Sequence, residues 1–178
     1  MKIAQFITHF PYKDRFTNAK EYAEIYHCGG GGRVAFELVN ELSKRNHTII
    51  VFTTSKDSKD LIEEADRIKV VRYGKTFRVS RTNISFKLFF RSLVYETDIV
   101  HIHNTTAPGV IAGLIYAKRK KKPLIITHHG AERFSNYGSL LRKIGVYIHA
   151  NYIVDKAFSL ADIIISPSEQ YIRESKYL

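Results

Sequence analysis

The stretch Arg33–Thr53, RVAFELVNELSKRNHTIIVFT, holds the pattern that decides the fold. Its first part has apolar residues at the i, i+3, i+4 and i+7 spacing of one helix face: Ala35, Leu38, Val39 and Leu42. Its second part, Ile49–Phe52, is apolar without alternation, which is typical of a strand covered on both faces. We therefore predict a helix over Arg33–Arg45 that leads directly into a buried strand over Thr48–Thr53.

The same alternation of short apolar runs and amphipathic segments continues along the chain. Further strands are expected at Lys2–Thr8, Ile68–Arg72, Ile99–His103, Leu124–Thr127 and Asp162–Ser166. Further helices are expected at Ile84–Tyr95, Gly109–Arg119 and Ser139–Leu160, the last with a break near Gly145. Such alternation predicts an α/β fold, an open parallel sheet covered by helices on both faces. No repeat or linker divides the 178 residues, so we expect one domain.

Composition narrows the class of protein. A hydrophobic fraction of 44% with 25% charged residues excludes a disordered, collagen-like or coiled-coil chain. A single cysteine, Cys28, excludes a disulfide framework and a cysteine zinc site. The longest apolar stretch, Gly109–Ala117, is far shorter than the ~20 residues of a membrane span. The N-terminus has too short an apolar run for a secretory signal, so we expect a cytoplasmic protein.

The chain is basic, with 28 Lys and Arg against 17 Asp and Glu, or 28 − 17 = +11. Residues from Arg67 to Tyr95 include no acid, and a second basic cluster follows at Lys118–Lys122. Such regions attract nucleic acid, anionic lipid or phosphorylated small molecules, and charge alone does not choose among them. The second cluster is best interpreted as a solvated loop between a helix and a strand.

The segment Ile84–Tyr95 combines an aromatic helix face, which includes Phe86 and Phe90, with Lys87 and Arg91. A helix of this kind can lie on an anionic membrane. The favoured interpretation is a helix packed on the sheet with its cations in water, because a sheet covered on both faces needs such a helix. Peripheral contact with the inner face of a membrane stays open as an alternative.

Polar residues gather where the predicted strands end. In an open parallel sheet, the loops at the carboxyl ends of the strands meet in a crevice where ligands bind. The loops in question are Thr8–Tyr12, His103–Thr106, His128–Gly130 and Ser166–Glu169. Since four strand ends each bring hydrogen-bonding groups, we predict a functional crevice at this edge.

The run Gly29–Gly32 precedes the first predicted helix. Glycines there allow backbone N–H groups to approach an anion at the positive end of the helix dipole, which predicts a phosphate site. The alternative is a flexible loop that needs positive φ values. The run is not a dinucleotide fingerprint, because glycine would be required at Val34 and no acid follows the second strand.

Three other sequence features give weaker evidence of function. Gly74–Thr76 imitates the end of a P-loop, but the upstream glycine position holds Lys69. His101 and His103 lie on one face of a strand, yet few carboxylates are near enough in the pattern to complete a metal site, so no metal is expected. Cys28 is interpreted as a small packed residue instead of a reactive thiol.

Taken in order, five stretches resemble the motifs of the N-terminal half of the family 4 glycosyltransferases, whose GT-B architecture has two facing Rossmann-like domains. The stretches are GGGGRVAFEL at Gly29–Leu38, ELSKRNH at Glu41–His47, DIVHIHN at Asp98–Asn104, THHG at Thr127–Gly130 and ADIIISPSE at Ala161–Glu169. Asn46 replaces the usual glycine of the second motif. The resemblance covers nearly the whole chain.

The resemblance implies a Rossmann-like domain over residues 1–178 that forms the acceptor side of a retaining, hexosyl-type transferase. Gly29 and Gly30 match the family's glycine pair and, with Gly31, would bind the donor's diphosphate and sugar. His129 matches the catalytic histidine that contacts the transferring sugar. The acceptor cleft would include His103, Asn104, Gly130, Ser168 and Glu169.

By the same resemblance, the reaction needs no cofactor or metal, and a nucleotide-sugar and a hydroxyl acceptor are its substrates. The family's nucleotide-sugar pocket lies in a second, C-terminal domain beyond Leu178, so we expect the isolated chain to be inactive. Two other classes remain open, a basic nucleic-acid-binding module and a histidine-metal hydrolase. No nucleic-acid motif is found, and no nucleic-acid partner is expected.

Overall fold

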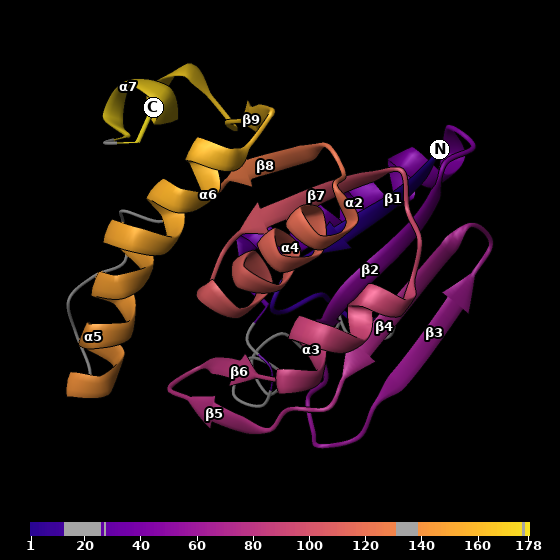
Figure 1. Cartoon of the computed structure of the whole chain (residues 1–178), viewed down its shortest axis with the longest axis horizontal. Coiled ribbons are helices and arrows are strands. Elements are labelled where there is room, and N and C mark those ends of the chain that lie inside the picture. Colours follow the sequence, from indigo (N-terminus) through magenta and orange to yellow (C-terminus); the bar gives the residue numbers. More distant parts are fainter. Residues whose placement is uncertain (13–25, 27, 131–138, 176) are drawn as a thin grey trace.

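The computed structural model describes residues 1–12, 26, 28–130, 139–175 and 177–178 (Figure 1). Within these residues, seven strands form one sheet in the order β3-β4-β2-β1-β7-β8-β9. All neighbouring strands are parallel except β3 and β4. The strands are β1 (Lys2–Phe6), β2 (Thr48–Thr54), β3 (Leu61–Ala65), β4 (Ile68–Tyr73), β7 (Ile99–Asn104), β8 (Leu124–His128) and β9 (Ile163–Ile165).

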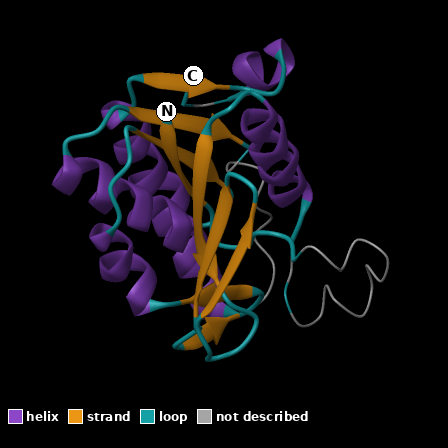
Figure 2. Ribbon diagram, turned by 90° about the vertical axis from the view of Figure 1, so that its right-hand side faces the viewer, coloured by secondary structure: helices purple, strands orange, loops and turns teal. Residues whose placement is uncertain are grey.

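Helices cover both faces of this sheet (Figure 2). Helix α2 (Gly30–Lys44) packs on one face. The other face carries α3 (Phe86–Phe90), α4 (Ala107–Lys120) and α6 (Val154–Leu160). The remaining helical segments are the 3₁₀ turn η1 (Arg91–Val94), α5 (Leu140–Ile148), the π-helical η3 (His149–Ile153) and α7 (Glu169–Glu174). The predicted Rossmann-like α/β fold is confirmed.

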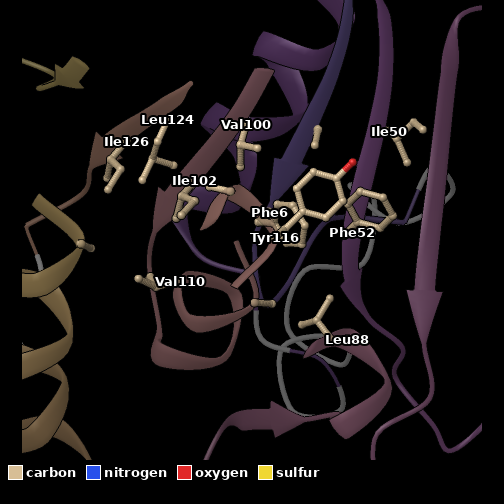
Figure 3. Packing of buried hydrophobic residues seen from close by; sticks show 14 of the residues in the cluster. Phe6, Ile50, Phe52, Leu88, Val100, Ile102, Val110, Tyr116, Leu124 and Ile126 are labelled. Atoms are coloured by element: carbon tan, nitrogen blue, oxygen red, sulfur yellow. The ribbon is translucent and has the colours of Figure 1, made fainter. Parts of the chain in front are cut away.

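The larger core cluster lies between the sheet and α3, α4 and α6 (Figure 3). The ring of Phe6 on β1 lies 4.9 Å from that of Phe52 on β2 and 5.3 Å from that of Tyr116 on α4, measured between centroids. A smaller cluster under α2 includes Val39 and Val51. Because both faces of the central strands are buried, their sequences are apolar without alternation.

Helix α4 approaches the sheet closely at two glycines. A Cβ atom on Gly109 would lie 2.6 Å from the backbone nitrogen of Thr8, and one on Gly113 would lie 2.5 Å from Cγ1 of Ile102. Neither site has room for a side chain. The absence of Cβ therefore sets the distance between α4 and strands β1 and β7.

Four elements were not expected. The edge strand β3 pairs antiparallel with β4 through a turn in which Asp66 has φ 49°. Two short strands, β5 (Phe77–Val79) and β6 (Thr82–Ile84), form a hairpin, and α7 follows β9. Strand β3 carries two glutamates and lies at a solvated edge, so its sequence, LIEEA, lacks the apolar run that identified the central strands.

All four predicted helices differ in their bounds from the observed ones, and in three of them the difference changes the local structure. The segment predicted as a helix over Ile84–Tyr95 is helical only from Phe86 to Phe90 and then tightens into η1, because Ile84 pairs with β5. The long C-terminal helix departs from α-geometry at His149–Ile153, and Gly145 lies within regular α5. Helix α2 begins at Gly30, so the glycine run forms its first turn instead of preceding it.

Candidate functional site

The first turn of α2 contacts the loops that follow β7 and β8. A Cβ atom on Gly31 would lie 2.6 Å from Cγ2 of Thr105 and 3.3 Å from Cγ of His129. A Cβ atom on the next glycine, Gly32, would collide with Sγ of Cys28 and would lie 3.2 Å from the backbone oxygen of His9. Segments distant in the sequence therefore meet around this turn, at the carboxyl edge of the sheet.

Cys28 belongs to this packing. Its thiol donates a hydrogen bond to the backbone oxygen of His9 at 3.4 Å. Burial raises the pKa of the Cys28 thiol to about 12, so the sulfur stays protonated at neutral pH. This geometry agrees with the interpretation of Cys28 as a small packed residue.

Three imidazoles form a column that we call the histidine stack: His101, His103 and His129. The ring centroids of His101 and His103 are 4.6 Å apart, and those of His103 and His129 are 5.5 Å apart. Strand alternation places His101 and His103 on the face of β7 that bears α2, and His129 follows β8 beside them. The stack connects the buried sheet surface to the first turn of α2.

Hydrogen bonds fix the rings of the stack. Nε2 of His101 lies 2.7 Å from the hydroxyl of Thr127. Nε2 of His103 lies 3.0 Å from Oε1 of Gln5, and its Nδ1 lies 3.3 Å from Nε2 of His129. A carbonyl oxygen only accepts, so Nε2 of His103 is the donor and its Nδ1 accepts from His129. This arrangement leaves Nδ1 of His129 as an acceptor.

The stack is uncharged at neutral pH. Burial, followed by the neighbouring His129, lowers the pKa of His101 to about 4. Burial and the other two imidazoles hold the pKa of His103 well below its usual range. Burial, followed by His128, lowers the pKa of His129 to about 4. Of the three rings, only His129 is partly exposed, so it is the member that can meet a ligand, as a neutral hydrogen-bonding group.

Two residues predicted for the acceptor cleft are fully buried. His103 is 0% exposed and reaches the edge of the sheet only through His129. Asn104, also 0% exposed, is the next residue along β7, so its side chain lies on the opposite face, where Nδ2 lies 3.5 Å from Nδ1 of His128. Its Oδ1 has no hydrogen-bond partner among the described residues. Direct contact of either side chain with an acceptor stays a prediction.

The other predicted cleft residues lie in different surroundings. Gly130 has φ 74°, a conformation that favours glycine and turns the chain directly after His129. Ser168 accepts a hydrogen bond from the backbone of Tyr171 and caps α7. Glu169 pairs with Arg173 in the same helix. Within the described residues, no hydrogen bond or ring contact joins Ser168 or Glu169 to the histidine stack.

Two residues that hold the site together, Gln5 and Thr8, were not among the predicted binding residues, although Thr8 belongs to a loop predicted to line the crevice. Gln5 is a polar residue inside the apolar strand β1, and this pattern could have indicated a buried hydrogen bond. Its side chain holds the ring of His103 through Nε2. Thr8 joins β1 to two neighbours: its hydroxyl accepts from the backbone of Gly109 at 2.8 Å, and its carbonyl accepts from the hydroxyl of Thr54 at 2.6 Å. Both residues hold the loops of the site in place.

The basic region from Arg67 to Tyr95, predicted to attract anions, includes Arg72, and the structure shows that this cation is buried. Its side chain is 1% exposed and donates to the backbone oxygens of Phe10 and Pro11, both at 2.7 Å. The guanidinium lies 3.6 Å from the centroid of the Tyr12 ring and pairs with Glu63. Arg72 therefore fixes the loop after β1, and it contributes no charge to a polyanion-binding surface.

The described part of the chain shows neither a metal-binding cluster nor a membrane-spanning helix. Its residues contain no group of three or more His, Cys, Asp or Glu side chains arranged to hold a metal ion. None of its helices has the length and apolar character required to cross a membrane.

Comparison with protein families matches residues 28–176 to "Glycosyltransferase Family 4". The chain belongs to glycosyltransferase family 4. A solved structure similar to this family 4 domain is sucrose-phosphate synthase from Thermosynechococcus elongatus, with a TM-score of 0.58 and 16% sequence identity. The match covers 97% of this chain and 44% of that chain, so the chain spans less than half of that protein's length. The likeness shows the fold. A comparison with curated proteins found no match.

Proposed function

We propose that this chain forms the acceptor side of a retaining glycosyltransferase, which moves a hexosyl group from a nucleotide-sugar to a hydroxyl acceptor. One observation carries the proposal: the first turn of α2 touches His129 at Gly31. A helix N-terminus, which favours anions, therefore lies against a neutral imidazole that can bind a sugar hydroxyl. Membership of family 4 supports the glycosyltransferase assignment.

The donor's diphosphate would bind at the start of α2. The first turn contains no acidic residue, and none of the described residues lies within 4 Å of a Cβ position on Gly30. Backbone N–H groups of Gly29 and Gly30 lie at the positive end of the helix dipole, and no described side chain crowds the Cβ position of Gly30. Negative charge develops on the departing phosphate, so donors fixed at this position stabilise it.

His129 would hold the transferring sugar. Its Nδ1 can accept a hydrogen bond from a sugar hydroxyl while its Nε2–H is bound to His103. Positive charge develops on the sugar as the bond to phosphate breaks, and a protonated imidazole would oppose it. The low pKa of His129, about 4, removes that repulsion at neutral pH.

In the retaining reaction, the bond between the anomeric carbon and the phosphate oxygen breaks, and a bond from the acceptor oxygen forms on the same face. The acceptor's proton passes to the departing phosphate, so the step balances without a further base. The nucleotide pocket would come from a second Rossmann-like domain. The similar synthase, which is more than twice as long as the matched region, supports this division.

Two experiments test the proposal. Isothermal titration of residues 1–178 with nucleotide-sugars should detect no micromolar binding, and a micromolar dissociation constant would contradict the division between domains. In a protein that joins this chain to a nucleotide-sugar-binding domain, His129→Ala should lower kcat by about a hundredfold. His47→Ala is the control, because His47 precedes the first residue of β2 and the candidate site lies at the carboxyl ends of the strands. This variant should retain activity. Equal activities for the two variants would overturn the role of His129.

A further inference from the structure

We propose that helix α3 and the β5–β6 hairpin form a docking surface for an anionic membrane. The surface consists of four exposed apolar side chains, which we call the α3 patch: Phe77, Phe86, Phe90 and Val94. Their exposed fractions are 43%, 53%, 64% and 78%. Neighbouring Leu88 is fully buried and Phe89 packs against the core. The helix therefore packs on the sheet through one face and leaves an apolar face in solvent.

The aromatic members of the patch are continuous. The rings of Phe77 and Phe86 are 5.9 Å apart between centroids, across the boundary between the hairpin and α3. The ring of Phe89 lies 6.4 Å from that of Phe86 and 6.3 Å from that of Phe90. Phenylalanine is one of the side chains that insert at the boundary between lipid headgroups and acyl chains.

The basic residues around the α3 patch indicate which kind of partner it binds. Arg81 and Arg91 are exposed, and Lys75 and Lys87 are partly exposed. The contacting acid is Asp60, whose carboxylate lies 2.9 Å from Lys87 and 3.8 Å from Arg91, so two cations share one negative charge. The whole chain carries +11. An anionic lipid surface complements both the positive charge and the apolar rings, whereas a nucleic-acid duplex offers no apolar layer for the rings to enter.

The position of the patch relates it to the candidate site. The backbone nitrogen of Asn83, on β6, donates to Nε2 of His9 at 3.2 Å, and its Nδ2 donates to the backbone oxygen of Ser55 at 2.9 Å. The hairpin is therefore fixed to the loops after β1 and β2, at the carboxyl edge (Figure 1). If the proposed function holds, docking through the patch brings this edge close to a lipid-linked acceptor.

Helix α5 provides the matched control. Leu140 and Leu141 are 74% and 63% exposed, as exposed as members of the α3 patch. They closely follow residues 131–138, which lie outside the described part of the chain, so nothing in the structure shows what covers them. Substitutions there remove the same kind of apolar surface without touching the proposed membrane contact.

The test is flotation with vesicles, without nucleotide-sugar or acceptor, so it is independent of the proposed reaction. At low ionic strength, the chain should bind vesicles of phosphatidylglycerol and phosphatidylcholine and should not bind pure phosphatidylcholine. Arg81→Glu with Arg91→Glu should weaken binding by about tenfold or more, since each basic residue contributes to the attraction. Phe86→Ser with Phe90→Ser should weaken it comparably, and Leu140→Ser with Leu141→Ser should leave it unchanged.

Circular dichroism of each variant checks that the fold persists, which the exposure of all the substituted side chains favours. Absence of binding by the original chain would overturn the proposal, as would an equal loss in the α5 control. Loss of binding in the charge variant with full binding in the phenylalanine variant would also overturn it, because the rings would then make no membrane contact. A concentration-dependent dimer in light scattering that the phenylalanine variant abolishes would assign the patch to a second copy instead.

Discussion

Gly31 lies where the first turn of α2 meets Thr105 and His129. Gly31→Ala would place a methyl group 2.6 Å from Cγ2 of Thr105 and 3.3 Å from Cγ of His129, so one or both of these side chains must shift. We expect the stability to fall by about 1–3 kcal/mol, as for other overpacked sites. Urea denaturation measures this. Gly145→Ala, with none of the described residues within 4 Å of its Cβ position, should be neutral or slightly stabilising, and a similar loss at both sites would contradict the close contact at Gly31.

Gln5 sets the orientation of the histidine stack through Nε2 of His103. Gln5→Leu removes the acceptor and leaves a buried imidazole N–H unpaired, which should cost about 1–3 kcal/mol. The ¹⁵N chemical shifts of the imidazoles in NMR give a direct readout: in the original chain, Nε2 of both His103 and His129 should carry the proton. Gln170→Leu, on the exposed helix α7, is the control and should change neither the shifts nor the stability. Protonation at Nδ1 of His103 would contradict the arrangement.

Among single residues, the sequence was most informative for residue types that have few structural roles in a given position, such as a run of glycines before a helix. The glycine run and His129 were identified, and the structure brings them into contact. Burial was harder to predict. His103 was predicted to end a strand and Asn104 to follow it in the crevice loop, yet both lie in β7, on opposite faces and fully buried. In the sequence, Arg72 cannot be distinguished from an exposed arginine of the same basic segment. Only the fold shows that it binds backbone oxygens.

Strand β4 offers a comparison between two cations that pair with β3. Arg72 is buried and holds the backbone of Phe10 and Pro11, whereas Lys69 pairs with Glu64 at 2.7 Å and is 34% exposed. Arg72→Met should lower the free energy of unfolding by about 3 kcal/mol, because two buried carbonyls lose their donors. Lys69→Met should cost less than about 1 kcal/mol, as expected of a surface pair. Equal effects in thermal denaturation would show that the Arg72 contacts contribute little.

Helices and strands were predictable where their apolar residues follow one clear pattern. The central strands and α2 follow from continuous apolar runs and from the 3.6-residue spacing. The edge strand β3 and the β5–β6 hairpin lack both signals, since they are short and solvated, and their pairing depends on partners brought by the fold. The π-helical turn at His149–Ile153 has no breaking residue, so its position was not readable from the sequence.

For the molecule as a whole, buried neutral histidines predict a loss of stability in acid. Burial lowers the pKa of His149 to about 4, as it does for His101. Between the unfolded pKa and this folded value the unfolded chain binds more protons, so stability is complete above the unfolded pKa and falls as the pH drops toward about 4. Each such histidine contributes up to about 3 kcal/mol of this loss.

Urea denaturation at neutral and at mildly acidic pH measures this dependence. His149→Phe removes one of the groups that must take up a proton on unfolding, so the difference in stability between the two pH values should shrink relative to the original chain. His47→Phe is the control, because this residue lies at the start of β2 and away from the core. An unchanged difference in the His149 variant would contradict its neutral, buried state.

Because the histidine stack holds no charge near neutrality, it also constrains enzyme kinetics. A protein containing this domain should show a pH–rate profile without an inflection from His129 over the neutral range, since that ring is already deprotonated there. Any limb of the profile in that range would then report on a group other than His129, such as the substrate's own phosphate. The shape of that curve thus separates a hydrogen-bonding role of His129 from a role that needs it to change its charge.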